Sequence, residues 1–204
     1  MVHDYFVRLK RAKGEQPKKL KLFMMHPMGA GASMFAHFLY NAPEDCEIYA
    51  IQSPGRENRL QEPNHTHLTP LLEELEQAFD RLMEDEKRLG WDGEIAFYGH
   101  SYGGIVMFEL YRSLRAAGKK LPVHFFSSAT MAPQLTGTWK NRDALRETGK
   151  ASNSEQKILG LLSYIDDLEF VKQIMPGMRR DMPLLMSYEY QHAEPLSCPI
   201  SVFS

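Results

Sequence analysis

The sequence predicts an α/β fold, in which a mostly parallel sheet carries helices on both of its faces. Short strand-like apolar runs alternate along the chain with segments whose apolar residues repeat at helical spacing. Strands separated by helices favour parallel pairing through right-handed crossovers. The length of 204 residues, with 43% hydrophobic and 25% charged residues, suits one globular domain with a small insertion. The carboxyl ends of the strands should then share one sheet edge, where ligands bind.

The predicted elements follow in chain order. Strands are predicted at residues 19–26, 47–52, 94–98, 123–129 and 199–203. Between them we expect helices at residues 33–39, from Thr69 onward, and from Ile105 to Leu114 with an end near Gly118. Thr69 is the expected N-cap of the second helix, with Pro70 at its first helical position. Residues 53–67 form a polar loop rich in Pro, Gly and Asn.

The stretch from 135 to 194 interrupts this alternation, because it contains helix-like pieces and no convincing strand. We interpret residues 1–134 as the core, 135–194 as a helical lid and 195–204 as the return to the core; ordinary packing helices are the alternative. Met178, Met182 and Met186 recur at a spacing of four, which favours a packing stripe. Arg179 and Arg180 are expected on a solvated helix face, or against an acidic partner.

Composition excludes several classes of function. The formal net charge of −2 gives no reason to expect nucleic acid or a membrane surface as a partner. Cys46 and Cys198 form no CxxC pair and are expected as free thiols. No metal-binding motif, signal peptide or transmembrane run is visible, so we expect a cytoplasmic protein without a metal.

The run from Phe97 to Gly104 carries the strongest chemical signal. It contains G-x-S-x-G between a strand-like and a helix-like run, which is the context of a nucleophile elbow. Gly99 and Gly103 allow a strained turn that exposes the Ser101 hydroxyl, and the next helix presents its N-terminus to developing negative charge. We therefore predict a catalytic serine; a glycine-rich structural turn is the alternative.

A second glycine-rich loop follows the first predicted strand, at residues 26–32. An acyl-transfer enzyme stabilises its oxyanion with backbone N–H groups, one from the residue after the nucleophile and one from such a loop. Tyr102 and Met28 are the candidates, with Gly29 as the second choice in the loop. A plain turn is the alternative, and the spacing does not match a phosphate-binding loop.

Four segments together resemble the external (type II) thioesterases of polyketide and nonribosomal peptide pathways: HPMGAGAS, SPGRENR, GHSYGG and SATMAP. The similarity runs from about Lys19 to Ser204 and extends to the thioesterase of animal fatty acid synthase. It implies an α/β-hydrolase fold with a helical lid. It also implies hydrolysis of acyl groups from the phosphopantetheine arm of an acyl or peptidyl carrier protein, in editing or release during antibiotic biosynthesis. No cofactor is implied. Ser101 would be the nucleophile, and Met28 and Tyr102 the oxyanion donors.

A base and an acid are missing from the expected positions. The resemblance places both after the strand at 199–203, where the chain ends. A longer form that holds them is our first interpretation; the others are an inactive relative that only binds carrier protein, or a resident histidine, such as His192 or His26, that serves as the base after a rearrangement. Another serine hydrolase, a carboxylesterase or acyltransferase, is the alternative activity. We also expect an exposed sheet edge, with poor stability or self-association.

Overall fold

The computed structural model of the protein describes residues 5–10, 19–136 and 168–204, which form a six-stranded sheet with several helices. The strand order is β1-β3-β2-β4-β5-β6. β1 runs antiparallel to β3, whereas the other neighbouring strands are parallel. The strands are β1 (Phe6–Lys10), β2 (Leu20–Met25), β3 (Cys46–Ile51), β4 (Glu94–His100), β5 (His124–Ser128) and β6 (Ile200–Phe203).

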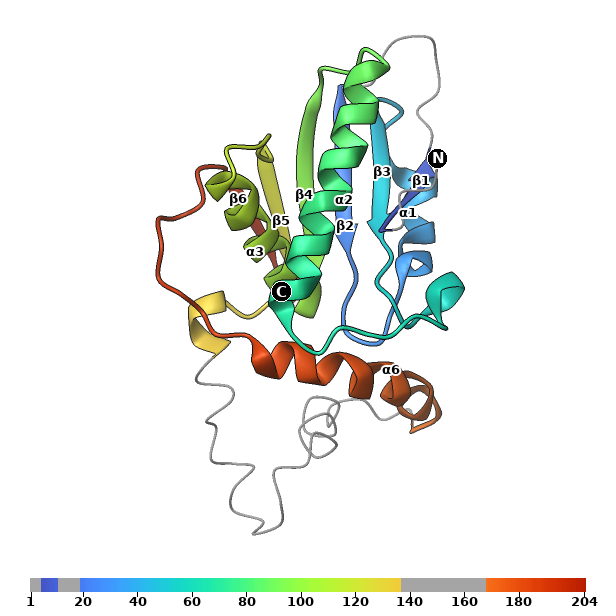
Figure 1. The fold of residues 1–204 in the computed structure, drawn as a ribbon. Coiled ribbons are helices and arrows are strands. Elements are labelled where there is room, and N and C mark those ends of the chain that lie inside the picture. Colours follow the sequence, from blue (N-terminus) through green and yellow to red (C-terminus); the bar gives the residue numbers. More distant parts are fainter. Residues whose placement is uncertain (1–4, 11–18, 137–167) are drawn as a thin grey trace.

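Helices cover both faces of this sheet (Figure 1). The α-helices are α1 (Phe38–Asn41), α2 (Leu68–Arg88), α3 (Tyr102–Ala116) and α6 (Leu168–Ser187). The 3₁₀ helices are η1 (Ala32–His37), η2 (Glu57–Arg59) and η3 (Pro133–Leu135). The long helices α2 and α3 pack side by side on one face, and η1 packs on the other.

The side chains of β2 point alternately to the two faces of the sheet, and each face carries its own hydrophobic core. Phe23 and Met25 belong to the cluster under α2 and α3, whereas Met24 belongs to the cluster that contains Phe35 of η1. Successive side chains of a strand point to opposite faces, so one strand supplies both cores. All six residues of β3 are buried, as expected for a strand covered on both faces.

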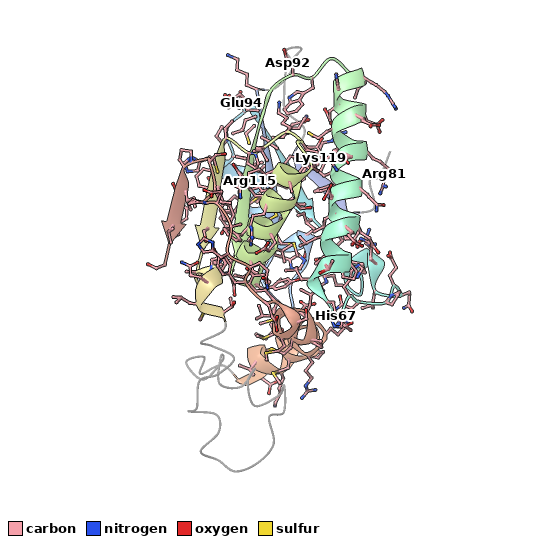
Figure 2. All side chains as sticks on the ribbon, turned by 60° about the vertical axis from the view of Figure 1, so that its left-hand side comes forward. His67, Arg81, Asp92, Glu94, Arg115 and Lys119 are labelled. Atoms are coloured by element: carbon pink, nitrogen blue, oxygen red, sulfur yellow. The ribbon has the colours of Figure 1, made fainter. Side chains whose placement is uncertain are left out.

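Helix α6 lies across the end of the sheet at which the parallel strands finish (Figure 1). A Cβ atom built on its Gly177 would lie 2.6 Å from the Cα atom of Gly29, in the loop after β2. Figure 2 shows the same polarity, with His67 near α6 and Glu94, the first residue of β4, at the opposite end. Among the described helices, none is both long and apolar enough to cross a bilayer.

The predicted alternation of strands and helices is confirmed, with three corrections. β1 was not predicted; it is a five-residue edge strand that pairs on one side only. The helix expected at 33–39 is mostly the 3₁₀ turn η1. The N-cap of α2 is His67 rather than Thr69, and Pro70 is the third helical residue. Proline is tolerated there because the first turn has no internal acceptor for its N–H group. The division at 134 and 135 stays a prediction, because residues 137–167 lie outside the described ranges.

Candidate active site

Ser101 forms the whole turn between β4 and α3, as the elbow prediction requires. Its backbone has φ 53° and ψ −121°, a conformation that residues other than glycine rarely adopt. The strain is held by hydrogen bonds on both sides. The Ser101 N–H group donates to the Ser128 carbonyl at 2.8 Å, and the Gly104 N–H group donates to the Ser101 carbonyl at 2.9 Å. Such stored strain is typical of a functional site.

The glycines around Ser101 are required by close backbone contacts. A Cβ atom at Gly99 would lie 2.5 Å from the Cα atom of Gly104, inside the same turn. A Cβ atom at Gly103 would lie 2.4 Å from the Met25 carbonyl oxygen and 2.6 Å from that of His26. The start of α3 therefore lies directly against the loop that leaves β2.

Thr130 supports the elbow from the segment after β5, a role that the sequence reasoning did not assign. Its hydroxyl oxygen lies 3.1 Å from the Ser101 carbonyl oxygen and 3.0 Å from that of Ser128. A Cβ atom at Gly104 would clash with this threonine at 2.1 Å. The only signal in the sequence was the SATMAP segment, which contains Thr130.

The loop after β2 leaves one candidate oxyanion donor free. The Gly29 N–H group donates to the Asp181 carboxylate at 2.8 Å. Within the described parts of the chain, neither the Met28 nor the Tyr102 N–H group has a protein acceptor. This pattern favours Met28 over Gly29 as the loop donor. Tyr102 is the first residue of α3, where the positive end of the helix adds to its N–H group.

The PGRE tetrapeptide, residues 54–57, holds this loop in place. Arg56 donates to the Ala30 carbonyl at 3.0 Å and to the Pro54 carbonyl at 3.3 Å, so its side chain ties two backbone carbonyls together. The Glu57 carboxylate accepts hydrogen bonds from the N–H and hydroxyl groups of Ser33, at 3.2 and 2.7 Å.

His26 is buried beside the loop and is engaged elsewhere. Its Nδ1 lies 2.8 Å from the Pro27 carbonyl oxygen and its Nε2 lies 3.4 Å from the Ser53 hydroxyl. Burial, with the nearby Arg56 charge, lowers the pKa of His26 to about 4. The ring is therefore neutral at pH 7, and it donates to Pro27 rather than accepting a proton from Ser101.

His100 and His124 are also hydrogen-bonded to groups other than the nucleophile. The His100 ring lies 3.0 Å from the Ser128 hydroxyl, and burial lowers its pKa. The His124 ring lies 2.9 Å from the Ser201 hydroxyl, and His192 is exposed between α6 and β6. Across residues 5–10, 19–136 and 168–204, no histidine ring is hydrogen-bonded to the Ser101 hydroxyl. Neither the His26 ring nor the His192 ring is hydrogen-bonded to Ser101 in the described residues, and a resident base stays a prediction.

Among the aspartates of the predicted lid, the structure describes Asp181, and it forms no triad. Asp181 is buried and pairs with Arg56 rather than with a histidine. Asp143, Asp166 and Asp167 lie outside the described residues. In the part of the chain that the structure describes, no group of three potential ligands could hold a metal ion.

A cavity of about 390 Å³ opens between the start of α2, the middle of α3 and residues 187–191. Its nearest lining residue in α3 is Glu109, eight positions beyond Ser101. The cavity therefore does not contain the elbow.

A strained elbow serine at the carboxyl ends of parallel strands, beside a loop with a free N–H group, defines a serine hydrolase of the α/β-hydrolase fold. Residues 20–201 match the model of the thioesterase domain family, and the chain belongs to this family. The sequence is 32% identical to the gramicidin S biosynthesis protein GrsT of Aneurinibacillus migulanus, over 99% of this chain and 75% of that protein.

Two solved structures share the fold. RedJ, a thioesterase from the prodiginine biosynthetic pathway in Streptomyces coelicolor, has a TM-score of 0.70 and 26% identity, over 95% of this chain and 75% of its own. The type II thioesterase BorB from the borrelidin biosynthetic cluster has a TM-score of 0.66 and 24% identity, over 97% of this chain and 76% of its own. The family match confirms the predicted thioesterase family, and the two structures confirm the predicted fold.

Proposed function

We propose that this chain is a type II thioesterase, which removes acyl groups from the phosphopantetheine arm of an acyl or peptidyl carrier protein during polyketide or nonribosomal peptide biosynthesis. One observation carries the proposal: the strained Ser101 elbow lies within a thioesterase-family match from residue 20 to 201. No cofactor is needed, because the substrate itself brings the phosphopantetheine thioester. We place the activity in the cytoplasm, where Cys46 and Cys198 stay free thiols.

The geometry supports a two-step reaction. The Ser101 oxygen attacks the thioester carbonyl carbon, and the Met28 and Tyr102 N–H groups stabilise the oxyanion. The carbon–sulfur bond then breaks, and the thiol leaves with a proton. Water hydrolyses the acyl-serine and restores the hydroxyl. The described residues assign no general base for the serine proton, so the proposal names none.

The acyl chain is expected to lie against α6. Val171, Met175, Met178 and Met182 form an apolar cluster that Met28 and Ile174 contact. Methionine side chains are flexible and polarisable, which suits acyl groups of different shapes. The cluster borders the residue that would donate to the oxyanion, so an acyl chain placed here keeps its carbonyl near Ser101. In this proposal α6 belongs to a lid that extends over residues 135–194.

The substrate class can be tested by comparing esters with one acyl group. The same acyl chain is presented on a carrier protein, on N-acetylcysteamine and as an oxygen ester, to wild type and to Ser101→Ala. We expect the carrier-bound thioester to be cleaved fastest, and Ser101→Ala to reduce cleavage at least about a thousandfold. A preference for the oxygen ester would instead indicate a carboxylesterase. Carrier binding that survives Ser101→Ala, without turnover by wild type, would indicate a binding module.

A further inference from the structure

A buried ion pair joins the PGRE loop to α6, far apart in the sequence. Arg56 and Asp181 are separated by 125 positions, and their side chains are only 9% and 2% exposed. Both guanidinium terminal nitrogens donate to the two carboxylate oxygens, one of them at 3.0 Å. This bidentate geometry is the strong form of an arginine–carboxylate contact.

The same pair contacts the loop after β2 through two successive residues. The Asp181 carboxylate accepts the Gly29 N–H group at 2.8 Å, and Arg56 donates to the Ala30 carbonyl at 3.0 Å. Asn64 joins them, because its side chain accepts from Arg56 at 3.2 Å and donates to the Arg180 carbonyl at 2.8 Å. One ion pair thus fixes two peptide groups immediately after Met28.

Electrostatics explains why the Asp181 carboxylate needs the Arg56 guanidinium beside it. An unpaired buried carboxylate is costly, and beside an oxyanion it would oppose the developing negative charge. The Arg56 guanidinium cancels that charge. Asp181 can then hold the Gly29 N–H group without an electrostatic cost to the reaction.

We propose that Arg56 and Asp181 are positioning residues of the oxyanion hole. They occupy the Gly29 N–H group, fix the peptide that follows Met28, and leave the Met28 N–H group for the substrate. Because Asp181 belongs to α6, the same contact aligns this helix with the reacting carbonyl. This role rests on the proposed thioesterase function for its catalytic part, whereas the structural part stands without it.

Kinetics with Asp181→Asn and Arg56→Lys tests the catalytic part. Loss of an oxyanion donor reduces kcat about a hundredfold to a thousandfold, so misalignment of the loop should reduce kcat about tenfold to a hundredfold. The KM for the acyl thioester should stay within about threefold, because the acyl-binding cluster is untouched. Arg56→Lys keeps the charge but not the bidentate contact, so it should fold and lose part of kcat.

Glu62→Gln is the matched control. Glu62 pairs with Arg59 in the same loop, at 2.9 Å from the Arg59 Nε, but it is half exposed and does not touch the loop after β2. The same carboxylate-to-amide change should leave kcat unchanged there. Equal effects of Asp181→Asn and Glu62→Gln on kcat would overturn the positioning role.

Amide hydrogen exchange separates this inference from the proposed function. In Asp181→Asn, peptides that cover residues 26–34 should exchange faster, whereas peptides from α2 should not change. Unchanged exchange in residues 26–34 would overturn the inference even if the enzyme is active. If wild type shows no turnover even with imidazole added as an external base, the proposed function fails, and the exchange result still decides whether the ion pair holds the loop.

Discussion

Gly103→Ala is expected to lower the free energy of unfolding by more than about 3 kcal/mol. The added Cβ atom would meet two carbonyl oxygens, of Met25 at 2.4 Å and His26 at 2.6 Å. Both belong to the backbone at the end of a central strand, which cannot move without disturbing the sheet. Urea denaturation followed by circular dichroism measures the loss.

The control for this substitution is Gly90→Ala. Gly90 follows α2 with φ 81°, and an added Cβ atom there meets nothing within 4 Å. Gly90→Ala therefore loses stability only because alanine must adopt the left-handed backbone conformation, which costs about 1–2 kcal/mol. If both variants lose the same stability, the close approach of α3 to the loop after β2 is not as described.

Lys21→Met is expected to cost about 3–5 kcal/mol, because it leaves a buried carboxylate pair without its cation. Lys21 is 1% exposed and forms ion pairs with Glu47 and, at 2.9 Å, with Glu86. Its ammonium also lies 4.5 Å from the centre of the Trp91 ring. Urea denaturation at pH 7 gives the difference in free energy of unfolding.

Lys119→Met provides the comparison, since Lys119 also binds two carboxylates. It lies beside α2, where it pairs with Glu76 and Asp80, and its side chain is 26% exposed (Figure 2). Solvent screens such pairs, so we expect a loss within about 1 kcal/mol. A loss at Lys119 as large as that at Lys21 would contradict the assignment of the effect to burial.

The Lys21 effect should also depend on pH. Burial alone would raise the pKa of Glu86, but hydrogen bonds from Lys21 and Tyr49 outweigh it and hold the pKa below its ordinary value. Glu86 therefore contributes stability above the pKa of the unfolded chain, and this contribution is lost as the pH falls below about 5. The difference between wild type and Lys21→Met should narrow over that range. If the difference in free energy of unfolding between the two proteins stays constant from pH 7 to pH 3, the stabilising role of the ionised Glu86 is contradicted.

The features that the sequence predicts correctly depend on residues that are close together in the chain. The elbow follows from residues 97–104 alone, because glycine, serine and the flanking strand and helix are contiguous. The start of α2 was misplaced because Thr69 and Pro70 fit the first turn as well as the cap, and the His67 cap has no side-chain signal. β1 was missed because its five residues, two of them basic, are too short a run to distinguish a strand from a loop.

The contacts that complete the candidate site are not local. Arg56 lies in the SPGRENR segment, but nothing in the sequence connects it with Asp181 or with the Gly29 N–H group. The sequence shows which histidines are present but not what they contact. In the structure His26, His100 and His124 each have a hydrogen-bond partner other than Ser101.

The most direct test of Ser101 as the nucleophile is intact-mass analysis of the chain after incubation with an acyl-N-acetylcysteamine thioester and a fluorophosphonate, with and without added imidazole as an external base. The account predicts one covalent adduct per chain with either reagent, which peptide mapping places on the peptide that contains Ser101 and which is absent from Ser101→Ala. An increase with imidazole would show that the described residues lack an effective base. A folded wild-type sample that forms no adduct under either condition, or an adduct that persists in Ser101→Ala, would contradict the account.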